Sequence, residues 1–328
     1  RRVLFRSPPR PPLPAVNITT FTPHQARHRT EPPPPARSPA LNLSNLFRDR
    51  LFRSLRSSVS RRRDPAFSVV LGSFNRISLL PGVVESIRQE TGGESHEIIV
   101  VDGGSSDGSL EWLLQQKDIL TVVQHNRGEF RGRTLERRSW GYFMNLGFKI
   151  AQGEFILMVS DDTILLPGAV ASGLRIMREG GSRVGGAAFY FRDWPLEQDY
   201  CVQKTLGGKL MVNHGFFSRR ALEKVGWADE ENYRFYKADG DLALRLWEAG
   251  FIIMDVPGAR VEHYMDPQEA ARIENRGDEI LQRDREAYHR RWAPLLSRKE
   301  KPEKVRLVYS DPEQTAEKFF RPLLSRIR

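Results

Sequence analysis

The chain has 328 residues, of which 39% are hydrophobic, enough to bury a sizeable core in one large domain or two small ones. Its formal charge of +10 is concentrated in residues 1–64, where fourteen Arg and three acidic residues give +11, so the remaining chain carries −1. A nearly neutral body argues against nucleic acid as a partner, and a single cysteine, Cys201, excludes an intrachain disulfide and a cysteine-based metal site.

Residues 1–64 form a tail of unusual composition. They hold eleven of the 21 prolines and no glycine, so they bury too little apolar surface to offset chain entropy and are expected to be disordered. Over residues 41–63, Leu and Phe recur at near-helical spacing among arginines. Three interpretations stay open for this segment: peripheral contact with an anionic membrane surface, an organelle-targeting role, and a solvated linker. Apolar runs are far shorter than the roughly 20 residues that span a bilayer, so we expect a cytoplasmic protein, soluble or at the membrane periphery.

From residue 65 the chain alternates between short apolar runs and amphipathic stretches. Runs rich in β-branched residues predict strands, and stretches with a period near 3.6 predict helices. In chain order the pattern gives strand 67–71, helix 79–90, strand 97–101, helix 109–116, strand 120–124, helix 140–151, strand 155–159 and helix 167–177. This alternation predicts an α/β fold with a mostly parallel, Rossmann-like sheet flanked by helices, in which ligands bind beyond the carboxyl ends of the strands.

The second half of the body is less regular. It predicts strands 185–191 and 251–256 and helices 218–226 and 238–250. Beyond this region the chain is rich in charged residues, and we expect a helical C-terminal extension over residues 266–328.

The first loop able to do chemistry is "VVDGGSSDGSLEW" (100–112). Its glycines make a turn, and Ser106 or Asp107 caps the following helix. Asp102 stands before the cap, at the end of the strand, so capping does not account for it. A carboxylate there can accept hydrogen bonds from a nucleotide base or a ribose hydroxyl. The sequence contains neither a dinucleotide-binding fingerprint nor a P-loop.

The second such loop is "VSDDT" (159–163). The adjacent carboxylates of Asp161 and Asp162 at the end of a buried strand are costly unless a cation or solvent lies beside them. Hard oxygen ligands suit Mg²⁺ or Mn²⁺, which in turn bind diphosphates. A turn cap that uses Thr163 explains the same residues equally well, so both interpretations stay open at this point.

The third stretch is "ADGDLALRLWEAG" (238–250), a helix that opens with Asp239 and Asp241. Acids in a first helical turn are favoured by the helix dipole, which is a structural reason for both. Asp241 can pair with Arg245 at i+4, which leaves Asp239 able to act as a general base. His263 follows a predicted strand and a proline turn, and a lone histidine is by default structural.

Five stretches in this order resemble the family 2 glycosyltransferases, which have the GT-A fold of nucleotide-diphospho-sugar transferases. They are "FSVVLGSFNR", "EIIVVDGGSSDGS", "NLGFKIAQGEFILMVSDDTILLPGAV", "HGFFSRRALEKVGWADE" and "ADGDLALRLWEAGF". The resemblance runs from about Phe67 to His263. It implies a GT-A domain over residues 65–265, with a nucleotide-sugar half (65–165) and an acceptor half (166–265).

The resemblance also implies roles for residues on the donor side. Asp102 would bind the nucleotide base, helped by Ser73 and Asn75 in the first loop. Asp161 would contact the ribose or the metal shell. The donor would be a nucleotide-diphospho-sugar.

On the catalytic side, Asp162 aligns with the metal-binding acid, His263 with a further metal or diphosphate ligand, and Asp239 with the general base of inverting members. Two positions depart from the family pattern. Ser160 stands where an acid is usual, which makes the metal shell thinner, and Ala238 stands where Glu is common, which alters the acceptor side.

The implied reaction is inverting transfer of a sugar to an acceptor hydroxyl, assisted by Mn²⁺ or Mg²⁺, in glycan or polysaccharide biosynthesis. The acceptor would be a glycan, a lipid-linked molecule or a small molecule. Two other functions stay open: a nucleotidyltransferase that makes activated sugars, and a non-catalytic binding protein or scaffold with the same fold. The loop "GSFNR" has one Gly and one Arg, which argues against triphosphate chemistry. Metal-dependent nucleotide binding would argue against the scaffold.

Overall fold

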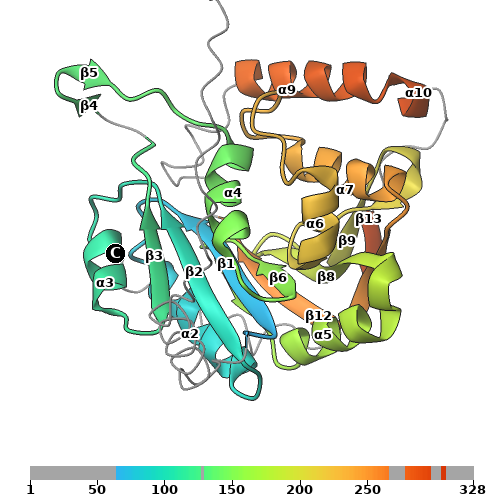
Figure 1. Ribbon diagram of the computed structural model, residues 1–328, viewed down its shortest axis with the longest axis horizontal. Coiled ribbons are helices and arrows are strands. Elements are labelled where there is room, and N and C mark those ends of the chain that lie inside the picture. Colours follow the sequence, from blue (N-terminus) through green and yellow to red (C-terminus); the bar gives the residue numbers. More distant parts are fainter. Residues whose placement is uncertain (1–63, 127–128, 266–277, 297–303, 308–328) are drawn as a thin grey trace, which may run out of the picture. The chain divides into compact units, whose positions relative to one another are not determined.

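The computed structural model describes residues 64–126, 129–265, 278–296 and 304–307. Within this part of the chain, eleven strands form one sheet with helices packed against it (Figure 1). Residues 1–63, which include most of the tail expected to be disordered and the segment 41–63 with its three open interpretations, lie outside the described residues. Among the helices that the structure describes, none has the length and apolar character needed to cross a membrane.

The N-terminal half of the body is a parallel sheet, as predicted. Its strands are β1 (Phe67–Ser73), β2 (His96–Asp102), β3 (Ile119–Val123) and β6 (Phe155–Met158), in the order β6-β1-β2-β3. The helices between them are α2 (Leu80–Thr91), α3 (Ser109–Gln115) and α4 (Trp140–Ile150), and a hairpin of β4 (Glu129–Phe130) and β5 (Arg133–Thr134) precedes α4. Because the four strands run in one direction, their carboxyl ends meet at one edge, where Ser73 lies opposite Asp102 in the register.

The C-terminal half of the sheet is mixed rather than mostly parallel. Its strands are β7 (Thr163–Leu165), β8 (Val184–Trp194), β9 (Tyr200–Thr205), β10 (Lys209–Leu210), β11 (Gly215–Ser218) and β12 (Ile252–Tyr264). Strand β11 runs antiparallel to both β6 and β8, and β9 runs antiparallel to β8 and β10. The connections from β8 to β9 and from β9 to β10 are short, and short connections permit only antiparallel pairing.

Helices α5 (Ala169–Gly180), α6 (Arg219–Val225) and α7 (Ala238–Glu248) accompany these strands, with the short 3₁₀ helices η1 (Gly181–Arg183) and η2 (Leu206–Gly208). Strand β12 is longer than the predicted strand 251–256, so His263 lies within it rather than beyond it. There His263 lies opposite Thr163 of β7 and Asp193 of β8. Pairing between strands therefore brings His263 to the loop that carries the two adjacent acids.

The C-terminal extension contains α9 (Asp278–Arg291), α10 (Ala293–Leu296) and the strand β13 (Lys304–Leu307). The strand was not part of the helical prediction, and it pairs antiparallel with β9. Its apolar Val305 packs against the main core, which gives these residues a reason to extend the sheet.

Candidate active site

A cavity of about 590 Å³ opens at the carboxyl edge of the parallel strands. Five of the residues singled out from the sequence line it, and they come from four separate segments: Ser73, Asp161, Asp162, Asp239 and His263. The fold therefore brings together the acidic pair, the helix acid and the histidine, as the sequence predicted. Asn75 and Asp102 are not among the residues that line this cavity.

Asp161 and Asp162 lie in the turn between β6 and β7, and both are buried. The guanidinium of Arg76, in the loop after β1, lies between them, with its Nε 3.5 Å from Asp161 and its Nη2 3.7 Å from Asp162. Burial raises the pKa of Asp161 to about 6, Arg76 opposes this shift, and the charge of Asp162 adds to it. Arg76 thus supplies part of the positive charge that the acidic pair requires.

The imidazole of His263 contacts two carboxylates, those of Asp193 and Asp162. Its Nδ1 lies 2.7 Å from Oδ1 of Asp193, and its Nε2 lies 3.3 Å from Oδ1 of Asp162. A carboxylate bonded to one ring nitrogen fixes the orientation of an imidazole whose other nitrogen faces a ligand. Among the described residues, no three Asp, Glu, His or Cys side chains are arranged as a ready-made metal cluster.

Asp239 lies in the first turn of α7, half-buried at the wall of the cavity. Its Oδ1 accepts a hydrogen bond from the backbone N–H of Gly240 (2.7 Å) and its Oδ2 accepts one from the side-chain amide of Asn213 (3.1 Å). Desolvation by the surrounding protein raises the pKa of Asp239, and these hydrogen bonds oppose the shift. Such a carboxyl group is a better proton acceptor than a solvent-exposed aspartate.

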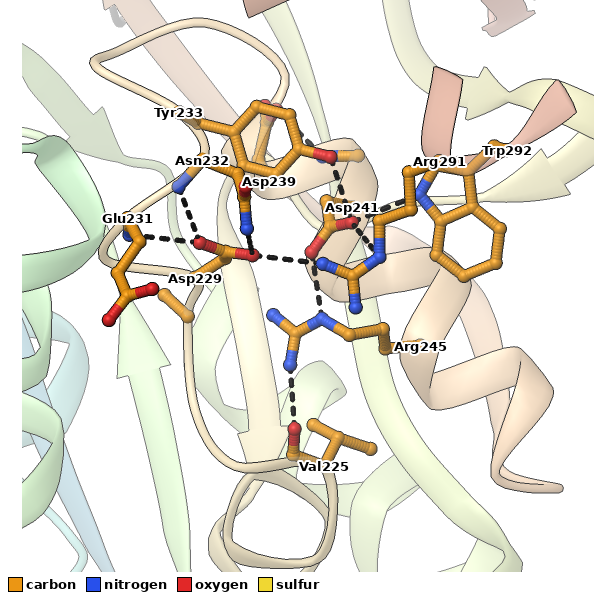
Figure 2. A network of polar contacts seen from close by, with 12 residues as sticks. Val225, Asp229, Glu231, Asn232, Tyr233, Asp239, Asp241, Arg245, Arg291 and Trp292 are labelled. Carbon is orange, nitrogen blue, oxygen red and sulfur yellow. Dashed lines mark hydrogen bonds and ion pairs between the residues drawn. The ribbon is translucent and has the colours of Figure 1, made fainter. Parts of the chain in front are cut away.

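Asp241, two residues further along α7, has a structural role (Figure 2). It is fully buried, and its Oδ2 accepts a 2.7 Å hydrogen bond from Arg245, which confirms the predicted i, i+4 pair. Its Oδ1 accepts hydrogen bonds from Tyr233 and Trp292, each at 3.0 Å. The two acids of this helix are therefore separated in function, since Asp241 is held within the protein and Asp239 faces the cavity.

Asp102 does not cap the helix, as inferred from the sequence, but its carboxylate is satisfied by hydrogen bonds within its own loop. It is fully buried, and its carboxylate accepts hydrogen bonds from the N–H groups of Gly104 and Ser105 (2.8 Å each) and from the Ser105 hydroxyl (2.6 Å). Asn75, with φ of 53°, bonds to the same loop through Ser105 and Ser106. Asn75 thus fastens the β1 loop to the β2 loop, while Asp102 holds the β2 loop in shape.

Several cavity residues were not predicted from the sequence. Four are basic and come from the segments before α4 and α7: Arg137, Arg138, Arg234 and Lys237. Burial, and then the proximity of Arg234, lower the pKa of Arg137. Runs of arginine on loops resemble solvated surface in a sequence, and only the adjacency of "ERRSW" to a predicted helix start could have indicated a role.

His214 was also missed. It lines the cavity beside His263, with the two ring centroids 5.5 Å apart. Burial lowers the pKa of His214 to about 3, with a smaller contribution from His263, so its imidazole is neutral at physiological pH. Asp193, Asn213 and His214 line the cavity and come from the half of the domain expected to bind the acceptor (166–265), in which none of the three was selected from the sequence.

Comparison with known proteins bears on the whole arrangement. Residues 68–226 match the family described as Glycosyl transferase family 2. The chain is 30% identical over 204 residues to a "PGL/p-HBAD biosynthesis glycosyltransferase" of Mycobacterium tuberculosis and Mycobacterium bovis, an overlap that covers 56% of this chain and 70% of the relative. It is also 30% identical over 179 residues to the "GalNAc(5)-diNAcBac-PP-undecaprenol beta-1,3-glucosyltransferase" of Campylobacter jejuni, over 54% of this chain and 50% of that protein.

Among solved structures, the mannosyltransferase PcManGT from Pyrobaculum calidifontis, in complex with GDP-Man and Mn²⁺, superposes with a TM-score of 0.49 at 16% identity. The superposition covers 75% of this chain and 71% of that one. The residues matched to the family end before α7, so Asp239 and His263 lie outside the matched segment.

Proposed function

The chain belongs to glycosyltransferase family 2 and is a glycosyltransferase, and from this premise we propose a specific reaction. A sugar passes from a nucleotide-diphospho-sugar to an acceptor hydroxyl, with metal assistance and inversion at the anomeric carbon, and Asp239 is the general base. One observation carries the proposal: Asp239 lines the same cavity as the acidic pair Asp161–Asp162. A base and a diphosphate site within one cavity are what a single displacement requires.

The charge along the cavity supports an anionic donor. Arg76, Arg137 and Arg138 line it together with the acidic pair. Guanidinium groups bind phosphate oxygens in bidentate geometry, so these side chains suit a diphosphate. We assign the base of the donor to the end near Phe74 and Gly103, at the carboxyl ends of β1 and β2. There Ser73 lies at the cavity wall, while Asp102 and Asn75 act by holding the loops in shape.

The residues also fit a divalent cation. Asp162 supplies carboxylate oxygens, the ligands that suit Mg²⁺ and Mn²⁺, and Nε2 of His263 lies 3.3 Å from one of them as an adjacent nitrogen donor. Two protein ligands are enough where substrate phosphates and water complete the shell, and Asp161 is adjacent. When bound, a cation held by these residues would supply positive charge beside the diphosphate.

Asp239 then acts on the acceptor. Its raised pKa makes it suited to take the proton of the acceptor hydroxyl as that oxygen attacks the sugar. Asn213 holds one carboxylate oxygen and the Gly240 N–H holds the other, so the base keeps its orientation. A single displacement of this kind inverts the anomeric configuration and needs no enzyme nucleophile.

The acceptor is proposed to be a glycan, a lipid-linked molecule or a small molecule bearing the attacking hydroxyl. The cavity does not support the nucleotidyltransferase alternative, which would need several basic groups in the loop after β1 to bind a triphosphate. That loop contributes only Arg76 as a basic group to the cavity. The scaffold alternative predicts that nucleotide binding and turnover are both absent.

The test is substitution of Asp239 by Asn, which keeps the side-chain volume and removes the base. We expect turnover of a nucleotide sugar to fall by at least about a hundredfold. Turnover is monitored by the nucleoside diphosphate that is released. Binding of the nucleoside diphosphate with Mn²⁺, measured by calorimetry, should stay near the wild-type affinity.

Glu248→Gln is the matched control, because Glu248 is an exposed acid at the end of the same helix. It should leave both quantities unchanged. Wild-type turnover in Asp239→Asn would remove Asp239 from the mechanism, and retention of the anomeric configuration in the product would contradict the single displacement.

A further inference from the structure

We propose that Asp284, on the C-terminal helix α9, is a positioning residue that sets the acceptor-side wall of the cavity. Its carboxylate accepts hydrogen bonds from three consecutive backbone N–H groups: those of Arg234 (2.9 Å), Phe235 (2.8 Å) and Tyr236 (2.8 Å). Asp284 itself is fully buried. It lies about 50 residues further along the chain than the loop that it holds.

These three residues matter because their side chains line the cavity. The loop continues through Lys237, whose φ of 67° is a left-handed conformation, into α7 and Asp239. A lysine adopts that conformation only where neighbouring contacts determine it. The Asp284 carboxylate supplies such a contact, because it accepts hydrogen bonds from the three N–H groups directly before Lys237. Hydrogen bonds to a charged acceptor are about twice as strong as neutral ones.

The C-terminal end of α9 and the residue after it also contact the first turn of α7 (Figure 2). The indole Nε1 of Trp292, at the end of α9, donates to Asp241 at 3.0 Å, and the Nε of Arg291 lies 3.3 Å from the same carboxylate. The other end of the Arg291 guanidinium donates to Asp229 at 2.9 Å. Two anchors, one before the loop joins the helix and one after, therefore define where Asp239 stands.

An apolar cluster separate from the main core lies between these elements. Its members come from η2, from the loop before α7, from α7 and from α9 and its end: Leu206, Tyr233, Ala238, Leu244, Tyr288 and Trp292. Burial of this cluster gives α9 a reason to dock that does not depend on Asp284. A change at Asp284 can therefore loosen the loop while α9 stays in place.

Substitution of Asp284 by Asn, with amide hydrogen exchange as the first readout, tests this assignment. The amide keeps the size of the side chain but cannot accept three N–H bonds in the same geometry. We expect exchange of residues 231–239 to rise by about tenfold or more, while β1 (67–73) exchanges at the wild-type rate. Glu279→Gln, an exposed acid on the same helix, should change neither segment.

Kinetics give the second readout. This readout rests on the proposed function, because it assumes that the acceptor binds at the wall formed by residues 234–236. In Asp284→Asn, we expect the KM for the acceptor to rise by about tenfold or more, with unchanged calorimetric affinity for the nucleoside diphosphate and Mn²⁺. Asp284→Glu, which keeps the charge, should recover part of that loss.

Exchange at the wild-type rate over 231–239 in Asp284→Asn would overturn the assignment, because Asp284 would then not hold the loop. An equal rise of exchange in β1 would also overturn it, because the effect of Asp284 would then be on global stability. Should Asp284→Asn not fold, Asp284→Glu decides the question by the same measurements, and an unchanged acceptor KM in it would overturn the proposal. Failure of the proposed function is a separate result, since it would appear as absent turnover in the wild-type protein while the exchange result stands.

Discussion

The role proposed for Asp239 sets two opposing requirements. As the proposed base it would have to be ionised, yet the protein around it disfavours the charge and raises its pKa. Sites that combine burial with a task for the charged form are frequently catalytic, because stability is given up there for reactivity. The pKa of Asp161 is also raised, to about 6 and mainly by burial. Arg76 lies beside it and partly offsets the cost of burying the charged carboxylate.

The pH dependence of transfer should report the raised pKa of Asp239. Turnover is expected to fall as pH is lowered through that value, about tenfold for each further pH unit, because only the carboxylate accepts a proton. The usual pKa of aspartate is about 3.9, and the midpoint of the pH profile should lie above that value. The measurement is kcat against pH at saturating substrates.

The same shift predicts a change in stability. Because the folded-state pKa exceeds the unfolded one, the ionised carboxylate costs stability, and the cost grows as pH rises from the unfolded value through the folded one. Asp239→Asn should therefore melt at a higher temperature than the wild type at pH 7.5, with the difference shrinking near pH 4. An equal difference at both pH values would contradict burial as the cause.

At the scale of elements, the position of α4 depends on a close approach to the sheet. A Cβ added to Gly147 would lie 2.5 Å from Val70 of β1 and 3.2 Å from Val101 of β2. The helix begins at Ser139 and Trp140, which line the cavity, so its distance from the sheet sets that part of the wall.

Gly147→Ala is expected to destabilise the protein by about 1–3 kcal/mol, although Ala favours helix over Gly by about 1 kcal/mol. Overpacking against β1 outweighs the gain in helix propensity. Chemical denaturation measures the effect, with Gly93→Ala as a control because an added Cβ there has open space. A stabilised Gly147→Ala variant would mean that α4 can move away from the sheet at little cost.

At the scale of the molecule, binding and folding are linked. A ligand that binds only the folded protein raises the free energy of unfolding by about 2.7 kcal/mol at 100 times its Kd. The cavity is built from segments between Gly72 and Met265, so a nucleoside diphosphate within it would tie together both halves of the sheet.

We therefore expect a nucleoside diphosphate with Mn²⁺ to raise the melting temperature of the wild-type protein. Asp162→Ala should lose most of the metal-dependent part of this shift, because it removes the carboxylate that lies 3.3 Å from His263. Asp199→Ala, a change at a surface acid paired with Arg306, is the control. An unchanged shift in Asp162→Ala would exclude Asp162 from the metal site, and no shift in the wild type would favour the scaffold alternative.

The sequence by itself determined the parallel half of the fold. Strands β1, β2, β3 and β6 and the helices between them follow from apolar runs and helical periodicity, and these are local properties of the chain. The i, i+4 pair of Asp241 and Arg245 was predictable for the same reason. The family, too, could be recognised from motifs, because their order along the chain is itself sequence information.

Only the tertiary structure decided which polar residues share the cavity. Asp102 and Asn75 carry the right chemistry, yet hydrogen bonds within the loops direct Asp102 away from the cavity. Asp193 and His214 attracted no attention in the sequence and became cavity residues through the pairing of β8 with β12 and β11. Asp284 reaches its partners across about 50 residues, a contact that no local pattern encodes. Side-chain partners at long range depend on packing of whole elements, whereas secondary structure depends on neighbours along the chain.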